Sequence, residues 1–162
     1  MPPRTRTSSV DRLELKVPPL LLAAVLAGGM GGLAWALPGA AFPLPMATGL
    51  GIAFGLLGIG IAAAGLLAFR RHRTTVDPLH PERAAQVVQT GIYGRTRNPM
   101  YLGVSLVLLG WALHLHHGVA LLGVPAFMAW LDRFQIRPEE RILHDRFGAD
   151  YEAYLRAVRR WF

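Results

Sequence analysis

The residues best suited to chemistry lie where a turn-rich stretch leads into an apolar segment. In "GIYGRTRNPMYLG", residues 91–103, arginines, an Asn-Pro pair and tyrosines come directly before the apolar residues. A helix that begins near Pro99 presents unpaired backbone N–H groups and a positive dipole end, and both attract an anionic group. Arg97 adds positive charge, and Tyr93 and Tyr101 offer aromatic faces to a cation. Ordinary membrane-boundary chemistry explains the same residue types, because arginine and tyrosine are common at that interface.

A second candidate group lies near the C-terminus, in "RPEERILHDRFG" and "YEAYLRAVRRW". Pro138 suits the first turn of a helix, and Glu139 and Glu140 are favourable near its positive end. Their carboxylates can accept hydrogen bonds from hydroxyl or ammonium groups of a ligand. The alternative interpretation is that they only stabilise the first turn.

The end of this helix and a second short helix are also predicted. Gly148 is a suitable helix stop, and Asp150 is a suitable cap for a helix that runs to Arg160. Its apolar face shows the spacing i, i+3, i+4, i+7 and consists of Tyr151, Tyr154, Leu155 and Val158.

Apolar segments must position these groups. A bilayer crossing needs about 20 apolar residues, and four blocks approach this length: residues 17–37, 46–69, 99–117 and 118–134. The last two are separated only by "HLHHG", so we expect a tight helical hairpin. Gly51 and Gly55 form a GxxxG pattern, which predicts close helix packing. The fold class that we predict is an all-α integral membrane protein of about four spans, with a C-terminal helical segment covering the site.

Charge predicts the orientation of these spans. All 17 Lys and Arg residues fall in three segments, residues 1–16, 70–98 and 133–162, and the acidic residues lie in or directly beside them. Four crossings place these segments on one side, and the positive-inside rule makes that side cytoplasmic. We therefore expect a single membrane domain, residues 1–162, in the inner membrane. Residues 1–16, the loop 70–98 and the tail 135–162 are then cytoplasmic, and the net charge of +7 reflects orientation, with no nucleic acid as partner.

Several other chemistries are excluded or disfavoured. The chain has no cysteine, so thiolate chemistry and Cys-ligated zinc are ruled out. His114, His116 and His117 lie on the opposite side from the candidate groups, and we interpret them as an interfacial loop and predict no metal site. The "GLGIAFG" stretch lies inside an apolar block and lacks a preceding strand, so it is not a dinucleotide fingerprint. The remaining basic residues are expected to contact anionic lipid: Arg141, Arg146, Arg156, Arg159 and Arg160.

The ordered motifs resemble the isoprenylcysteine carboxyl methyltransferase and phospholipid methyltransferase superfamily. That family has Gly-x-Tyr, then Arg-His-Pro-x-Tyr opening a membrane helix, a helical hairpin, Glu-Glu-x-x-Leu, and Phe-Gly-x-x-Tyr-x-x-Tyr. The resemblance covers about residues 85–162. The matching positions are Gly91, Tyr93, Arg97, Asn98, Pro99, Tyr101, Glu139, Glu140, Leu143, Phe147, Gly148, Tyr151 and Tyr154. The family's histidine is replaced by Asn98, which forms hydrogen bonds but does not titrate near neutral pH.

The resemblance implies an S-adenosylmethionine-dependent methyltransferase. It places at the cofactor a strand-like stretch near residues 85–88, the Asn98–Tyr101 stretch and Glu139, and it turns Glu140 or Arg137 toward the substrate. The implied cofactor residues are Gln86, Val87, Val88, Tyr93, Arg97, Asn98, Pro99, Met100, Tyr101 and Glu139. Methyl transfer from a sulfonium needs mainly alignment and exclusion of water, and Glu140 is the candidate base if the acceptor is an amine.

The acceptor is expected to be a lipophilic or amphipathic molecule or a lipid, and its identity stays open between a prenylcysteine-like carboxylate, a lipid amine and a thiol. Two other functions remain as alternatives. One is an NADPH-dependent reductase, because sterol and steroid reductases resemble this chain in an Arg-x-Pro-x-Tyr helix start. The other is a non-enzymatic scaffold that binds anionic membrane lipids. The sequence does not determine the oligomeric state.

Overall fold

The computed structural model describes residues 13–42, 45–72 and 79–161, and this part of the chain is helical with no β-strand. The longer helices are α1 (Pro19–Ala36), α2 (Ala47–Arg71), α3 (Pro99–His114), α4 (Gly123–Leu131), α5 (Arg137–Phe147) and α6 (Ala149–Ala157). Short 3₁₀ turns lie between them: η2 (Pro38–Ala40), η3 (Pro81–Arg83), η4 (Gly91–Gly94) and η5 (Ala120–Leu122). A π-helical segment, η6 (Asp132–Ile136), joins α4 to α5.

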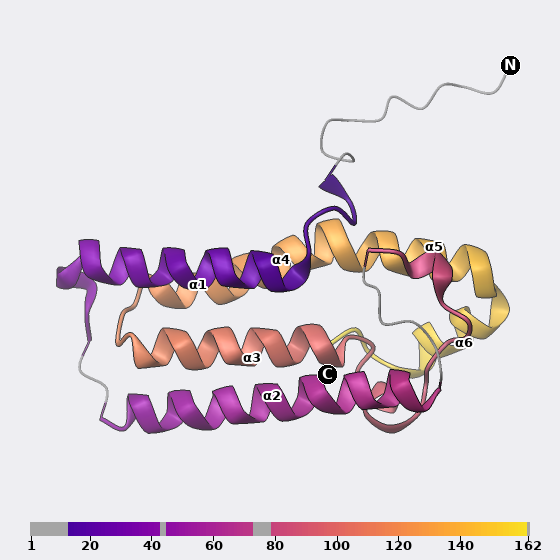
Figure 1. The fold of residues 1–162 in the computed structure, drawn as a ribbon, viewed down its shortest axis with the longest axis horizontal. Coiled ribbons are helices and arrows are strands. Elements are labelled where there is room, and N and C mark those ends of the chain that lie inside the picture. Colours follow the sequence, from indigo (N-terminus) through magenta and orange to yellow (C-terminus); the bar gives the residue numbers. More distant parts are fainter. Residues whose placement is uncertain (1–12, 43–44, 73–78, 162) are drawn as a thin grey trace, which may run out of the picture.

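Helix α3 is the central element of the bundle. It lies between α2 on one side and α1 with α4 on the other (Figure 1). The core between α1, α3 and α4 is apolar and includes Met30, Leu108, Phe127 and Leu131. Helices α5 and α6 gather at one end of the bundle, beside the N-terminus of α3 (Figure 1). The fold therefore brings the C-terminal segment to the place where α3 begins.

Glycines allow α2 and α3 to pack with their backbones in contact. A Cβ atom on Gly51 would lie 2.6 Å from the carbonyl oxygen of Gly110, and one on Gly58 would collide with the carbonyl oxygen of Gly103. A side chain at either position would force the helices apart. The contacting glycines are spaced by seven residues, and a Cβ on Gly55 would meet no atom within 4 Å. The close packing was predicted correctly, but its register follows a seven-residue repeat instead of the GxxxG pair.

Helices α1 and α2 are long and apolar enough to cross a membrane, with 18 and 25 residues. Their outward side chains are exposed, such as Leu20 at 71% and Trp35 at 87%, which argues against core helices of a soluble protein. Helix α3 has 16 residues, about 24 Å at 1.5 Å per residue, and is shorter than a hydrocarbon core of about 30 Å. Two of the four expected spans therefore meet the length criterion for crossing, and α3 and α4 are shorter than predicted.

The chain continues from α4 into α5 without a break, whereas the sequence suggested a boundary between residues 134 and 135. Pro138 has no N–H to donate to the carbonyl of Phe134, four residues earlier. The backbone N–H of Leu15 donates to that oxygen instead, at 2.9 Å. The π-helical turn and the proline thus leave a carbonyl that the N-terminal segment satisfies, and Pro138 lies at the start of α5 as expected.

Three local predictions were wrong and one was right. Gly148 ends α5 with a φ of 51°, as a glycine stop should. However, Gly148 itself precedes α6, so Asp150 lies within the first turn and does not cap it, and α6 ends at Ala157, before Arg160. Residues 85–88 are irregular and form no strand in the described part of the chain.

Candidate functional site

A cavity opens where α3 begins, beneath α5 and α6. The space between its walls, counted out to the solvent at its mouth, is about 830 Å³. Its walls come from the end of α2, the loop 80–98, the first turn of α3, and α5 and α6. The lining residues are Phe69, His80, Pro81, Ala84, Gln86, Val87, Val88, Tyr93, Arg97, Asn98, Met100, Tyr101, Ile136, Glu139, Glu140, Leu143, Tyr151 and Tyr154.

Glu139 and Tyr101 both line this cavity and are joined by a hydrogen bond. The hydroxyl of Tyr101 donates to Oε2 of Glu139 at 3.1 Å. Burial raises the pKa of Glu139 to about 7, although the Tyr101 hydrogen bond opposes the shift and the charge of Glu140 adds to it. A carboxyl group whose pKa lies near neutral pH can bind a cationic or hydroxyl-bearing ligand or exchange a proton with it.

Tyrosines from two distant segments line the cavity together. Tyr93 lies on η4 and Tyr154 on α6, and the hydroxyl of Tyr154 donates to the backbone carbonyl of Tyr93 at 2.8 Å. Phe69, at the end of α2, meets Tyr93 edge to face with ring centroids 5.2 Å apart. Burial raises the pKa of Tyr93 and of Tyr154 well above that of a free phenol, so both rings stay neutral. Neutral aromatic faces suit a planar base or a soft cation.

The N-terminus of α3 faces the same space. Pro99 begins the helix, and within the described part of the chain no side chain caps its first turn. The side-chain amide of Asn98 turns away from that turn and donates to the backbone carbonyl of Arg160 at 3.0 Å. The first-turn N–H groups of α3 therefore remain available to an anionic ligand group.

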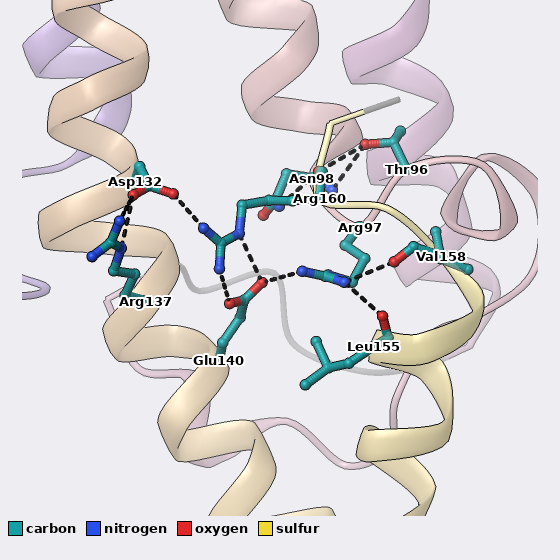
Figure 2. A network of polar contacts seen from close by, with 9 residues as sticks. All are labelled: Thr96, Arg97, Asn98, Asp132, Arg137, Glu140, Leu155, Val158 and Arg160. Carbon is teal, nitrogen blue, oxygen red and sulfur yellow. Dashed lines mark hydrogen bonds and ion pairs between the residues drawn. The ribbon is translucent and has the colours of Figure 1, made fainter.

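An ion-pair network closes one wall of the cavity (Figure 2). Glu140 accepts from Arg97 at 2.9 Å and from Arg160 at 2.6 Å. Arg160 also pairs with Asp132 of the π-helical turn at 2.5 Å, and Asp132 pairs with Arg137. Among the described residues, Nε of Arg97 is the only buried side-chain nitrogen or oxygen without a hydrogen-bond partner. Both oxygens of Glu140 are thus committed to guanidinium groups.

The structure brings most of the predicted site residues together. All of them line the cavity except Pro99 and Arg137. Pro99 is buried behind the wall, where it shapes the helix start. Arg137 is more than half exposed, pairs with Asp132 and does not line the cavity, so its position beside the substrate stays a prediction. Arg137 lies three residues before Glu140, on nearly the same side of α5, but its guanidinium pairs with Asp132 of the π-helical turn.

Several cavity residues escaped the sequence prediction. Tyr151 and Tyr154 were expected as an apolar helix face and as motif positions without a place at the cofactor, and Phe69 only as the end of a span, yet all three line the cavity. Arg160 was expected to contact lipid but pairs inward with two acids. The spacing of the tyrosines was a usable signal, whereas nothing distinguished Arg160 from its basic neighbours before the chain was folded.

Known proteins match this chain over its central part. The model of a family described as phospholipid methyltransferase matches residues 46–150, which include α2 to α5 and most of the cavity. A protein of Haemophilus influenzae, described as uncharacterized, is 45% identical over 62 residues. These residues are 38% of this chain and 98% of that protein. No solved structure matches the chain.

Proposed function

The chain belongs to the phospholipid methyltransferase family, and on this premise we propose that it transfers a methyl group from S-adenosylmethionine to a lipophilic or amphipathic acceptor at the cytoplasmic face of the inner membrane. The family implies a membrane methyltransferase that acts on lipids. The cofactor, the acceptor and the membrane side are our proposals. The observation that carries them is the meeting of the free N-terminal turn of α3, Glu139 and the tyrosines in one cavity.

The polar and aromatic groups that line the cavity match the functional groups of S-adenosylmethionine. Its carboxylate suits the first turn of α3, and its ammonium or ribose hydroxyls suit Glu139. Neutral faces of Tyr93 and Tyr154 suit the adenine ring or the sulfonium. Val88, Ile136 and Leu143 supply apolar surface between these polar groups. Bound in this way, the cofactor supplies a methyl group on a sulfur that already carries a positive charge.

The protein's own contribution is alignment and the exclusion of water. Holding two reactants in line saves about 7–11 kcal/mol of the barrier in favourable cases. No protein nucleophile is required. A carboxylate or thiolate acceptor also needs no base, whereas an amine must lose a proton first. Glu139 suits that task better than Glu140, because the guanidinium groups of Arg97 and Arg160 occupy both oxygens of Glu140.

The proposed orientation places all the charged segments together. Helices α5 and α6 and the loop 79–98 lie at the end of the bundle where α3 begins, and the connectors after α1 and α3 lie at the other end (Figure 1). Basic residues concentrate in the first group, so the positive-inside rule favours a cytoplasmic cavity and cytoplasmic termini. The water-soluble cofactor then enters from the cytoplasm and the acceptor from the lipid.

Calorimetric titration of S-adenosylhomocysteine into detergent-purified protein tests the cofactor. We expect saturable binding, and no binding at millimolar ligand by folded protein contradicts the proposal. NADPH in a parallel titration tests the reductase alternative, because binding of NADPH in place of S-adenosylhomocysteine would reverse the assignment. Binding of neither ligand would favour the lipid-binding scaffold.

The acceptor is identified by a labelling experiment. Membranes with and without the protein receive S-adenosylmethionine that carries a labelled methyl group, and the products are separated by mass. A labelled lipophilic product that depends on the protein supports the proposal. Label found only in water-soluble products would exclude a lipophilic acceptor.

A further inference from the structure

We propose that Asn98 and Arg160 are positioning residues: Asn98 holds the C-terminal strap (residues 158–161) across the start of α3, and Arg160 of this strap holds Glu140 on the cavity wall. The end of the chain then completes the cavity, although it lies beyond the residues that the family model matches. This inference rests on the proposed function, because the cavity is taken as the cofactor site.

The strap is fixed to the α3 start through its backbone. The side-chain amide of Asn98 and the hydroxyl of Thr96 both donate to the carbonyl of Arg160, at 3.0 and 3.2 Å. The backbone N–H of Arg97 donates to the carbonyl of Arg159 at 3.0 Å. Three consecutive residues before α3 thus bind two consecutive carbonyls of the strap, which fixes its register. Figure 2 shows the contacts that Thr96 and Asn98 make with Arg160.

The side chain of Arg160 then reaches back into the molecule. Its guanidinium bridges Glu140 of α5 and Asp132 of the π-helical turn, at 2.6 and 2.5 Å. The planar fork of an arginine can satisfy two carboxylates at once, which a lysine ammonium does with less directional control. The Glu140 side chain is only 16% exposed, so removing a guanidinium leaves negative charge in a poorly solvated place.

Arg97 couples the strap to the aromatic wall. One of its terminal nitrogens donates to the carbonyls of Leu155 and Val158, at 3.0 and 2.7 Å, at the C-terminal end of α6. The other donates to Glu140. Helix α6 carries Tyr154, whose ring lines the cavity. Loss of the strap therefore loosens both Glu140 and the tyrosine wall.

This arrangement defines what position 98 requires. The side chain needs an N–H group that reaches the carbonyl of Arg160, and neither a titratable group nor a ligand contact is needed. An imidazole also carries an N–H donor. The replacement of histidine by asparagine therefore keeps the donor, and the departure from the motif pattern need not cost the site its geometry.

Two substitutions at one position test the role of Asn98 in the full-length protein in detergent. Asn98→Leu has similar volume and no donor, and Asn98→His restores an N–H. We expect the dissociation constant for S-adenosylhomocysteine to rise about tenfold in Asn98→Leu and to stay within about threefold of wild type in Asn98→His. Trypsin should cut after Arg156, Arg159 or Arg160 faster in Asn98→Leu than in the other two proteins.

Arg160→Gln tests the same coupling independently, with Arg159→Gln as its matched control. Both variants lose one positive charge from adjacent residues, but the Arg159 side chain is exposed. We expect about tenfold weaker binding for Arg160→Gln and no change for Arg159→Gln. The double variant Asn98→Leu/Arg160→Gln should have about the same affinity as whichever single variant binds less tightly. The effects should not add, because both substitutions disrupt the same attachment of the strap.

The possible failures are distinguishable. If wild-type protein binds no S-adenosylhomocysteine, the proposed function fails and the positioning role fails with it. If wild type binds and Asn98→Leu binds equally well although its tail is cut faster, the positioning role alone is overturned. Equal loss of affinity in Asn98→Leu and Asn98→His would instead make Asn98 a direct ligand contact, and additive effects in the double variant would separate Asn98 from Arg160.

Discussion

The two ends of the bundle carry buried polar side chains but use them differently. At the connector end, His117 is almost fully buried, and both of its ring nitrogens are satisfied by the backbone. Nδ1 accepts from the N–H of Ala120 and Nε2 donates to the carbonyl of Leu37 at 2.8 Å. Backbone bonds from Phe42 to His116 and from Gly118 to Ala40 join the two connectors. This end is closed by its own hydrogen bonds.

At the cavity end, several polar groups are only partly hydrogen-bonded. Glu139 receives one hydrogen bond from Tyr101, and its carboxyl has a raised pKa. Nε of Arg97 is buried without a partner within the described chain, and the first turn of α3 has no side-chain cap there. Buried polar groups whose hydrogen bonds are all made within the protein, as at the connector end, stabilise the fold. Polar groups that are held in place but keep free hydrogen-bonding capacity, as at the cavity end, can bind a ligand.

The largest expected effect that separates the two ends comes from Glu139→Ala. This change removes the carboxylate that we assign to the ammonium or ribose hydroxyls of the ligand. Charged hydrogen bonds of this kind contribute about 1.5–3 kcal/mol, so the dissociation constant for S-adenosylhomocysteine should rise about 100-fold. Calorimetry measures it, and unchanged affinity in folded protein would remove Glu139 from the ligand site.

The pH dependence of binding sharpens the assignment. Glu139 has a pKa near 7 in the free protein, and ligand groups that donate hydrogen bonds favour its ionised form. Affinity should therefore fall as pH drops below about 7, by up to about tenfold per unit, and level off above it. Glu139→Gln cannot titrate and serves as the control, with a flatter profile. An equally steep profile in Glu139→Gln would assign the titration to another group.

The stability of the ligand-free protein should follow the opposite trend. Because the folded-state pKa of Glu139 lies above the value of 4.5 for a free glutamate, the folded state binds more protons between these two values. The protonated carboxyl stabilises the fold fully below about 4.5, and this contribution is lost as pH rises through about 7. Thermal unfolding of wild type relative to Glu139→Gln measures it, and a wild-type advantage that grows with pH would contradict the shift.

A smaller effect is expected from Tyr93→Ala. The substitution removes one aromatic face from the cavity, and such contacts contribute about 0.5–1.5 kcal/mol beyond their buried area. The dissociation constant for S-adenosylhomocysteine should rise about fivefold. Tyr93→Phe keeps the ring and should bind like wild type, so an equal loss in both variants would point to the hydroxyl.

The smallest effect on binding is expected at the connector end. His117→Ala leaves the carbonyl of Leu37 and the N–H of Ala120 without their partner, which should lower the free energy of unfolding by about 1–3 kcal/mol. Affinity for S-adenosylhomocysteine should not change. The half-buried neighbour His116→Ala is the control and should alter neither quantity much, because its ring contacts only a side-chain hydroxyl, that of Thr48, in the described part of the chain. Weaker ligand binding in either folded variant would contradict the division between the two ends.

The sequence predicted which residues form the site better than it predicted their individual contacts. Tyr93, Tyr101 and Glu139 were predicted to converge, and the structure places all three on one cavity. Glu139 and Glu140 could not be told apart in this way, because adjacent residues differ by about 100° around a helix. Only the packed fold turns Glu139 toward Tyr101 and Glu140 toward two arginines.

The glycines and the arginines of the tail show the same division. Composition predicted that α2 packs closely, but the partner helix selected Gly51 and Gly58 and left Gly55 without a contact at its Cβ. Similarly, the sequence predicted basic residues at the C-terminus on the charged side of the bundle. It did not show that Arg160 turns inward while Arg159 stays exposed.

By itself, the sequence determined the apolar segments, the clustering of charge between them and the order of the motifs, because these depend on neighbours along the chain. The tertiary structure decided which carboxylate stays incompletely paired, which arginine is committed to it and where the strap crosses α3. Those choices depend on contacts between residues some 20 to 60 positions apart, such as Arg97 with Glu140 and Asn98 with Arg160. No local pattern encodes them, since each requires both partners to be placed in space first.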